Sequence, residues 1–70
     1  MAKIVKQTSE NIAALRCRNA AKALESAAYA LDDVHSPNAT THAAEARGAA
    51  KIARQWANAL ERLHRAAQRI

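Results

Sequence analysis

Residues 46–70 read ARGAAKIARQWANALERLHRAAQRI, and their spacing is the strongest indication of the fold. Its apolar residues recur at alternating steps of three and four, which places them on one face of an α-helix. They are Ala46, Ala49, Ala53, Trp56, Leu60, Leu63, Ala67 and Ile70. This set, termed the second apolar ladder, predicts a long amphipathic helix.

An equivalent pattern runs through the first half of the chain. The first apolar ladder consists of Ala13, Cys17, Ala20, Leu24, Ala27, Leu31 and Val34. Its steps of four and three again keep the residues on one helical face. Two such ladders with a break between them predict an all-α fold, an antiparallel two-helix hairpin.

The break lies at the only proline, Pro37. Ser36 or Asn38 is expected to cap a new helix there, since proline suits the first helical turn. Thr8 or Ser9 is expected to cap the first helix. The expected elements are a helix over about 9–34, a turn over 35–38 and a helix over about 38–69, within one domain spanning 1–70.

A chain of 70 residues with a single cysteine has no internal disulfide to stabilise it, and an alanine-rich contact buries little area. Further apolar residues widen the second ladder beyond what one partner helix covers: Ala43, Ala50, Ile52, Ala57, Ala59 and Ala66. We therefore expect two hairpins to pair as a two-fold homodimer, an antiparallel four-helix bundle. Its expected core comprises Leu24, Leu31, Ile52, Trp56, Leu60 and Leu63. Gly48 is interpreted either as a point of close helix approach or as a tolerated defect.

The first residues lack the apolar core of a signal peptide, and no apolar run approaches the roughly 20 residues that span a bilayer. We expect a cytoplasmic protein without a membrane partner. Cys17 falls on the first ladder and is expected to act as a small buried apolar group.

Enzymatic chemistry is not indicated. Asp32 and Asp33 are adjacent, so on a helix they point about 100° apart. The three histidines share no ligand spacing, and no phosphate-binding glycine loop is present. We expect no catalytic residue, no cofactor and no metal.

The net charge of +5 comes largely from the second half of the chain. A basic ridge is expected opposite the second ladder, formed by Arg47, Lys51, Arg54 and Arg65 beside Asn58. Such a ridge is either a solvated face or a surface for anions, including RNA or DNA. A dimeric helical hairpin with a basic ridge resembles, in architecture, the small plasmid copy-number regulators that bind paired RNA loops, although no base-reading motif is visible.

A second candidate surface lies on the first helix, away from its ladder. Leu15, Lys22 and Tyr29 repeat every seven residues, and Arg18 stands beside them. Exposed tyrosine and arginine are favoured at protein interfaces. This stripe is interpreted either as a partner-binding surface or as the cover of an N-terminal segment containing Ile4 and Val5.

In size, alanine and arginine content and hairpin pattern, the chain resembles small phage-encoded proteins that inhibit host regulators or defence machinery, among them the phage anti-quorum-sensing proteins. The resemblance implies a helical homodimer that occupies a host protein, such as a transcription regulator or an ATPase. Residues 48–52, GAAKI, look like part of a helix in the anti-CBASS cyclic-dinucleotide sponges, whose following glycine, phenylalanine and methionine are missing here. We therefore expect a non-enzymatic protein-binding inhibitor, with a nucleic-acid-binding regulator and a cyclic-nucleotide sponge as alternatives.

Overall fold

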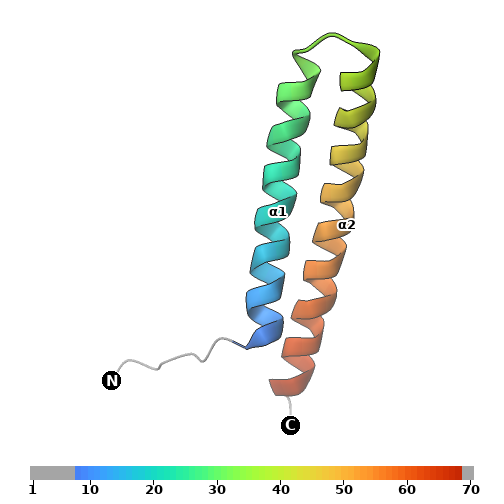
Figure 1. The fold of residues 1–70 in the computed structure, drawn as a ribbon. Coiled ribbons are helices and arrows are strands. Elements are labelled where there is room, and N and C mark those ends of the chain that lie inside the picture. The colour runs from blue at the N-terminus through green and yellow to red at the C-terminus, as the bar shows by residue number, and fades with distance from the viewer. Residues whose placement is uncertain (1–7, 69–70) are drawn as a thin grey trace, which may run out of the picture.

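The chain forms a hairpin of two antiparallel helices in a computed structural model that describes residues 8–68 (Figure 1). Helix α1 spans Ser9–Asp32 and helix α2 spans Pro37–Gln68. The two lie side by side along the length of α1 and are joined by a short turn. This confirms the predicted all-α hairpin. The expected contribution of Ile70 to the second ladder lies outside the described residues.

The helix ends follow local capping chemistry. The Thr8 hydroxyl accepts a hydrogen bond from the Asn11 amide at 3.2 Å, and the Ser36 hydroxyl accepts one from the Ala39 amide at 3.1 Å. Pro37 then opens α2, where its missing N–H costs no hydrogen bond. Helix α1 ends at Asp32, two residues before the expected end, and His35 adopts a left-handed conformation with φ of 56°. That residue reverses the chain direction.

The two helices touch along rows of alanine. On α1 the buried residues are Ala14, Ala21 and Ala28, and on α2 they are Ala39, Ala43, Ala50, Ala53 and Ala57. Leu24 packs, partly buried, against the cluster of Ala21, Ala50 and Ala53. Side chains this small let the helix axes approach closely, but they remove little apolar area from water.

Most residues of the expected ladders lie outside the contact between the helices, where Ala53 is the one buried residue among the described ladder positions and Leu24 packs against it. Trp56 and Leu63 are each 61% exposed, and Ala20 and Ala49 are also exposed. The most buried residues of α2 include Ala43, Ala50 and Ala57, which we expected to flank the ladder. The reason is geometric, because the apolar side of each helix is wide and only its alanine edge turns toward the other helix, leaving the larger residues beside the contact.

Gly48 is exposed, and a Cβ atom at its position would meet nothing within 4 Å. The close approach of the helices therefore occurs at the alanines, and the structure favours the interpretation of Gly48 as a tolerated defect.

Candidate interaction surfaces

Three ion pairs cross between the helices in a single row on one face of the hairpin. Arg18 pairs with Glu61 at 2.5 Å near the open end, Arg54 pairs with Glu25 at 2.6 Å in the middle, and Arg47 pairs with Asp32 near the turn. The residues of α1 rise in steps of seven while those of α2 fall in steps of seven. This ion-pair row lies beside the alanine contact and shows which residues of the two helices lie level with one another.

The row also fixes the alignment of the helices. From the open end, α1 presents Arg18, Glu25 and Asp32, whereas α2 presents the complementary Glu61, Arg54 and Arg47. A slip by seven residues would bring Arg18 toward Arg54, so the charge order opposes that misalignment. Sequence reasoning missed this row, although its heptad spacing and reversed charge order are visible in both halves of the chain.

The ion pairs shift the pKa values of their members. The pKa of Glu25 is lowered because Arg54 donates hydrogen bonds to its carboxylate, and the pKa of Glu61 is lowered for the same reason by Arg18. The pKa of Arg54 is raised in turn by its hydrogen bonds to Glu25. Glu25, Glu61 and Arg54 are therefore charged at neutral pH.

The expected basic ridge is partly neutralised. Two of its members, Arg47 and Arg54, are bound to carboxylates of α1. The neighbouring Asn58 accepts a hydrogen bond from Arg18 at 3.0 Å. Lys51 and Arg65 are exposed on the same flank of α2. Two arginines of the predicted ridge are therefore paired, because acidic residues of α1 lie level with them.

The Leu15, Lys22 and Tyr29 stripe is exposed, as expected. Leu15 is 58% exposed and Tyr29 is 73% exposed. The stripe borders the ion-pair row, since the guanidinium of Arg47 lies over the Tyr29 ring at 5.8 Å from its centre. Arg18, expected to assist the stripe, is held by Glu61 and Asn58. The stripe thus offers a leucine and a tyrosine next to charges that are already paired.

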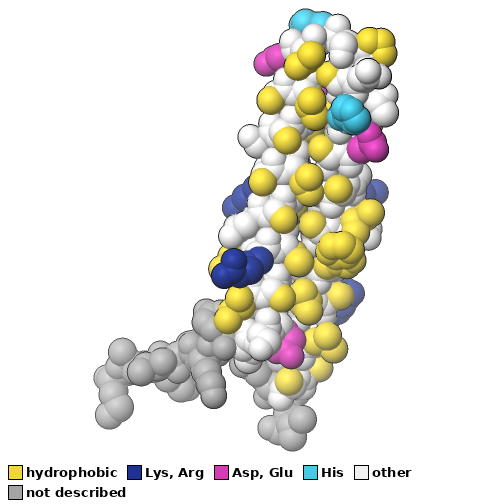
Figure 2. Space-filling model, in the orientation of Figure 1, with side chains coloured by type: hydrophobic (Ala, Val, Ile, Leu, Met, Phe, Trp, Pro, Cys, Tyr) yellow, Lys and Arg dark blue, Asp and Glu magenta, His cyan; other side chains and the backbone are white. Residues whose placement is uncertain are grey.

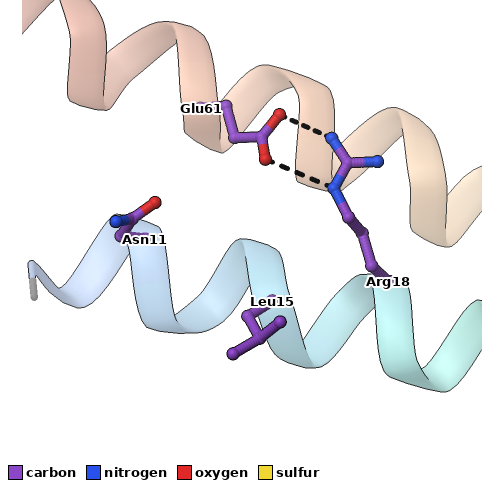
Figure 3. Close-up of a pocket in the computed structure, with 4 residues that line it drawn as sticks. All are labelled: Asn11, Leu15, Arg18 and Glu61. Atoms are coloured by element: carbon purple, nitrogen blue, oxygen red, sulfur yellow. Dashed lines mark hydrogen bonds and ion pairs between the residues drawn. The ribbon is translucent and has the colours of Figure 1, made fainter.

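A shallow pocket of about 220 Å³ lies at the Arg18 end of the row, where Asn11, Leu15, Arg18 and Glu61 line it (Figure 3). The Arg18 side chain reaches across to Glu61, while Asn11 and Leu15 lie one after the other along α1. The guanidinium of Arg18 and the carboxylate of Glu61 already bind one another. The pocket therefore combines one apolar side chain, Leu15, with the amide of Asn11 and an ion pair.

The opposite face of the hairpin is apolar. Each ion-pair residue is preceded by an apolar residue about 100° around the helix, on the other side of the alanine contact. These residues are Cys17, Leu24 and Leu31 on α1, and Ala46, Ala53 and Leu60 on α2. Farther round on the same side are Ala13, Ala20 and Ala27 on α1, and Ala49, Trp56 and Leu63 on α2. Figure 2 shows hydrophobic side chains along both helices on the face turned to the viewer.

The six residues on α1 are the first ladder without Val34, and the six on α2 are the second ladder without Ala67 and Ile70. We refer to these twelve residues together as the apolar face. Trp56 and Leu63 are mostly exposed there, and Ile52 at the margin is 46% exposed. Leu24, Leu31, Leu60 and Cys17 are half-buried, so Cys17 is less enclosed than expected. The apolar face contains five of the six residues expected in a dimer core, and the sixth, Ile52, lies at its margin.

Side chains suited to metal binding do not converge among residues 8–68. No group of three His, Cys, Asp or Glu residues in this part of the chain is placed to hold a metal ion. His42 pairs with Glu45 at 3.1 Å, and His64 Nδ1 lies 2.8 Å from the Thr8 hydroxyl. Neither described helix has the length and apolar character needed to cross a membrane.

In comparisons with known proteins, no family model, no curated protein and no solved structure matches this chain. The functional conclusion therefore follows from the surfaces just described.

Proposed function

We propose that this chain is a non-enzymatic protein-interaction module that works as a homodimer, in which two hairpins pack their apolar faces together as an antiparallel four-helix bundle. The observation that carries the proposal is the contrast between the two faces of the hairpin. One face has its charges paired across the helices, and the other lines up apolar residues along the full length of α1. In four-helix bundles, each hairpin buries one such face.

The energetics of the single hairpin support a dimer. All eight buried residues of the described chain are alanines, and no large side chain is fully buried there. Small domains rarely gain more than about 3–5 kcal/mol from one core even when it contains large residues. Fully burying a side chain such as Leu63 contributes about 1.5–3 kcal/mol. The residues with most to gain, Trp56 and Leu63, are those that a second copy would cover.

Sedimentation of matched double variants tests the dimer. Trp56→Ala with Leu63→Ala removes the two most exposed large side chains of the apolar face, and we expect a monomer at concentrations where the unaltered chain is dimeric. Leu15→Ala with Tyr29→Ala removes comparable exposed side chains from the opposite face and should leave the dimer intact. A monomeric unaltered chain that is well folded at micromolar concentration would contradict the proposal. Since Trp56 is the only tryptophan, its fluorescence emission should shift to the red on dilution.

The stripe of Leu15, Lys22 and Tyr29 is the surface we assign to a second protein. It lies beside the ion-pair row, on the side of the hairpin that faces outward in the proposed dimer. Tyrosine at an interface combines a large contact area with a hydroxyl that forms hydrogen bonds. The resemblance to phage inhibitors supplies the target class to test first, a host regulator or ATPase.

Binding to that target is tested with the same variants. The purified candidate target should bind the unaltered dimer and lose most of its affinity for the Leu15→Ala, Tyr29→Ala dimer. Arg16→Ala provides a control, because Arg16 is exposed and points about 100° around the helix from Leu15, away from the stripe. Equal binding of all three proteins would show that the stripe is not the target site.

Nucleic-acid binding is the second candidate, supported by the net charge of +5 and by the exposed Lys51 and Arg65. If it is the function, retention of RNA or DNA should fall steeply with salt. Lys51→Glu with Arg65→Glu should abolish retention, whereas the stripe variants should not affect it.

A further inference from the structure

The sizes of the residues on the apolar face follow an order along the hairpin. The ion-pair row shows which residues are level, and the neighbouring positions on the apolar face pair in the same alignment. From the open end to the turn, the level pairs are Ala13–Leu63, Cys17–Leu60, Ala20–Trp56, Leu24–Ala53, Ala27–Ala49 and Leu31–Ala46. Five of these six pairs join one large residue to one small one.

The large residues also change helix halfway along. Toward the open end they belong to α2, as Trp56, Leu60 and Leu63, and toward the turn they belong to α1, as Leu24 and Leu31. Each helix therefore presents a large half and a small half to whatever covers the apolar face. In such an order, the large half of each helix fits against the small half of the same helix in a second copy that runs in the reverse direction.

We propose that the two hairpins of the dimer pack with their turns at opposite ends, so that α1 lies against α1 of the second copy and α2 against its α2. This arrangement rests on the homodimer proposed above. The two-fold axis then passes between the levels of Ala20 and Leu24 on α1, and between those of Ala53 and Trp56 on α2. Every large residue on the face meets alanine on the facing helix.

Every layer of the resulting core combines large and small residues. Trp56 meets Ala53 and Leu24 of the second copy, and Leu60 meets its Ala49 and Ala27. Leu63 meets Ala46 and Leu31 of the second copy. With both turns at the same end, one layer would instead hold two Trp56 indoles and another would hold four alanines. Protein cores avoid such voids because they are packed to nearly crystalline density.

Charge at the ends of the face supports the same arrangement. Glu10 lies seven residues before Cys17, near the open end, and His42 lies seven residues before Ala49, near the turn. With the turns at opposite ends, Glu10 lies level with His42 of the second copy. With the turns at the same end, the two Glu10 carboxylates would share one end and repel one another.

The size of the apolar face suits a second copy as its occupant. Two helices, each about 10 Å wide and paired over about 36 Å, present roughly 700 Å². A stable dimer of ordinary size buries about 800 Å² per partner. The twelve positions of the face contain no Asp, Glu, Lys, Arg or His, so an identical face covers it without burying a formal charge.

Distances between spin labels distinguish the two arrangements. Asn38 is exposed in the first turn of α2, and Asn38→Cys in a Cys17→Ala background carries one label per copy. At 1.5 Å per residue, labels at opposite ends should lie about 45–50 Å apart, whereas labels at the same end should lie within about 25 Å. Gln55→Cys is the control, because it lies near the middle of the rod and should give a short distance in a dimer.

Each result decides a different question. A long Asn38 distance with a short Gln55 distance supports turns at opposite ends. A short Asn38 distance overturns this arrangement but leaves the dimer standing. A monomeric mass with no distance between labels overturns both the dimer and its arrangement.

A size substitution gives an independent test. Ala49 is exposed in the single hairpin, so Ala49→Leu should not disturb the contact between α1 and α2. In the proposed arrangement the added side chain meets Leu60 of the second copy, and dimerisation should weaken on the order of tenfold. With turns at the same end it would fill the four-alanine layer and strengthen the dimer. A dimer as tight as that of the unaltered chain, or tighter, overturns the proposal.

Discussion

The guanidinium of Arg54 binds the carboxylate of Glu25 through two parallel hydrogen bonds of 2.6 Å each, from α2 to α1. This two-bond geometry is the most directional form of an ion pair. It stands at the centre of the ion-pair row, with Arg18 and Glu61 on one side and Arg47 and Asp32 on the other. The Arg54–Glu25 ion pair therefore favours one specific alignment of α1 with α2.

Reversing this pair should show that it contributes to the alignment. Arg54→Glu places a second carboxylate opposite Glu25, and we expect the melting temperature to fall by a few degrees. Adding Glu25→Arg restores an attractive pair and should recover most of the loss. Arg62→Glu is the control, since Arg62 is exposed and forms no ion pair with the described residues. Thermal melts followed by circular dichroism give the values, and a double variant no more stable than Arg54→Glu would contradict this role.

The two bound carboxylates predict how stability depends on pH. The pKa values of Glu25 and Glu61 lie below the ordinary 4.5 because Arg54 and Arg18 donate hydrogen bonds to them. A pKa lowered by folding adds stability that is complete above the unfolded-state value and is lost as the pH falls through the folded-state value. We therefore expect the melting temperature to decline in acid, beginning near pH 4.5.

Neutral variants isolate that contribution. Glu25→Gln with Glu61→Gln should be less stable than the unaltered chain at pH 7 and should lose less of its stability in acid. Asp33→Asn serves as the control, because Asp33 is exposed and lies outside the row. If the double variant and the unaltered chain lose stability equally between pH 7 and pH 3, the two carboxylates do not cause the dependence.

The alanine contact predicts a strong sensitivity to side-chain size. Ala21 and Ala57 are fully buried, and Ala21 belongs to the central alanine cluster. Ala21→Leu has no room for its added carbons and should destabilise the hairpin by about 1–3 kcal/mol. Ala44→Leu, at an exposed position of α2, should change the stability little. Urea unfolding at a fixed protein concentration compares the two, and equal effects would mean that the helices do not meet at Ala21.

The hairpin and its boundaries could be predicted from the sequence because heptad steps and the Ser36–Pro37 pair act locally. The contact between the helices was harder to predict. In a bundle, the apolar side of a helix points between two neighbours, so a ladder through Trp56 does not show which edge touches the other helix. The charged residues contained that information. Glu25 and Asp32 follow Arg18 at steps of seven, and Arg54 and Arg47 are spaced to pair with them. The candidate sites remained open because an exposed pair such as Leu15 and Tyr29 does not identify its partner.

The exposed glycine of α2 offers a direct gain in stability. Gly48 lies in the helix interior, and nothing stands within 4 Å of a Cβ at its position. Gly48→Ala lowers the conformational freedom of the unfolded chain without creating a clash, and should stabilise the protein by about 1 kcal/mol. For a domain of this size that corresponds to a rise of roughly 4–8 °C in melting temperature. The reverse change at exposed Ala44, Ala44→Gly, should lower the melting temperature by a similar amount. Melts at one protein concentration keep the proposed dimer equilibrium from obscuring the comparison. A Gly48→Ala protein that melts lower than the unaltered chain would show that another surface packs against Gly48, which the paired hairpins as proposed leave exposed.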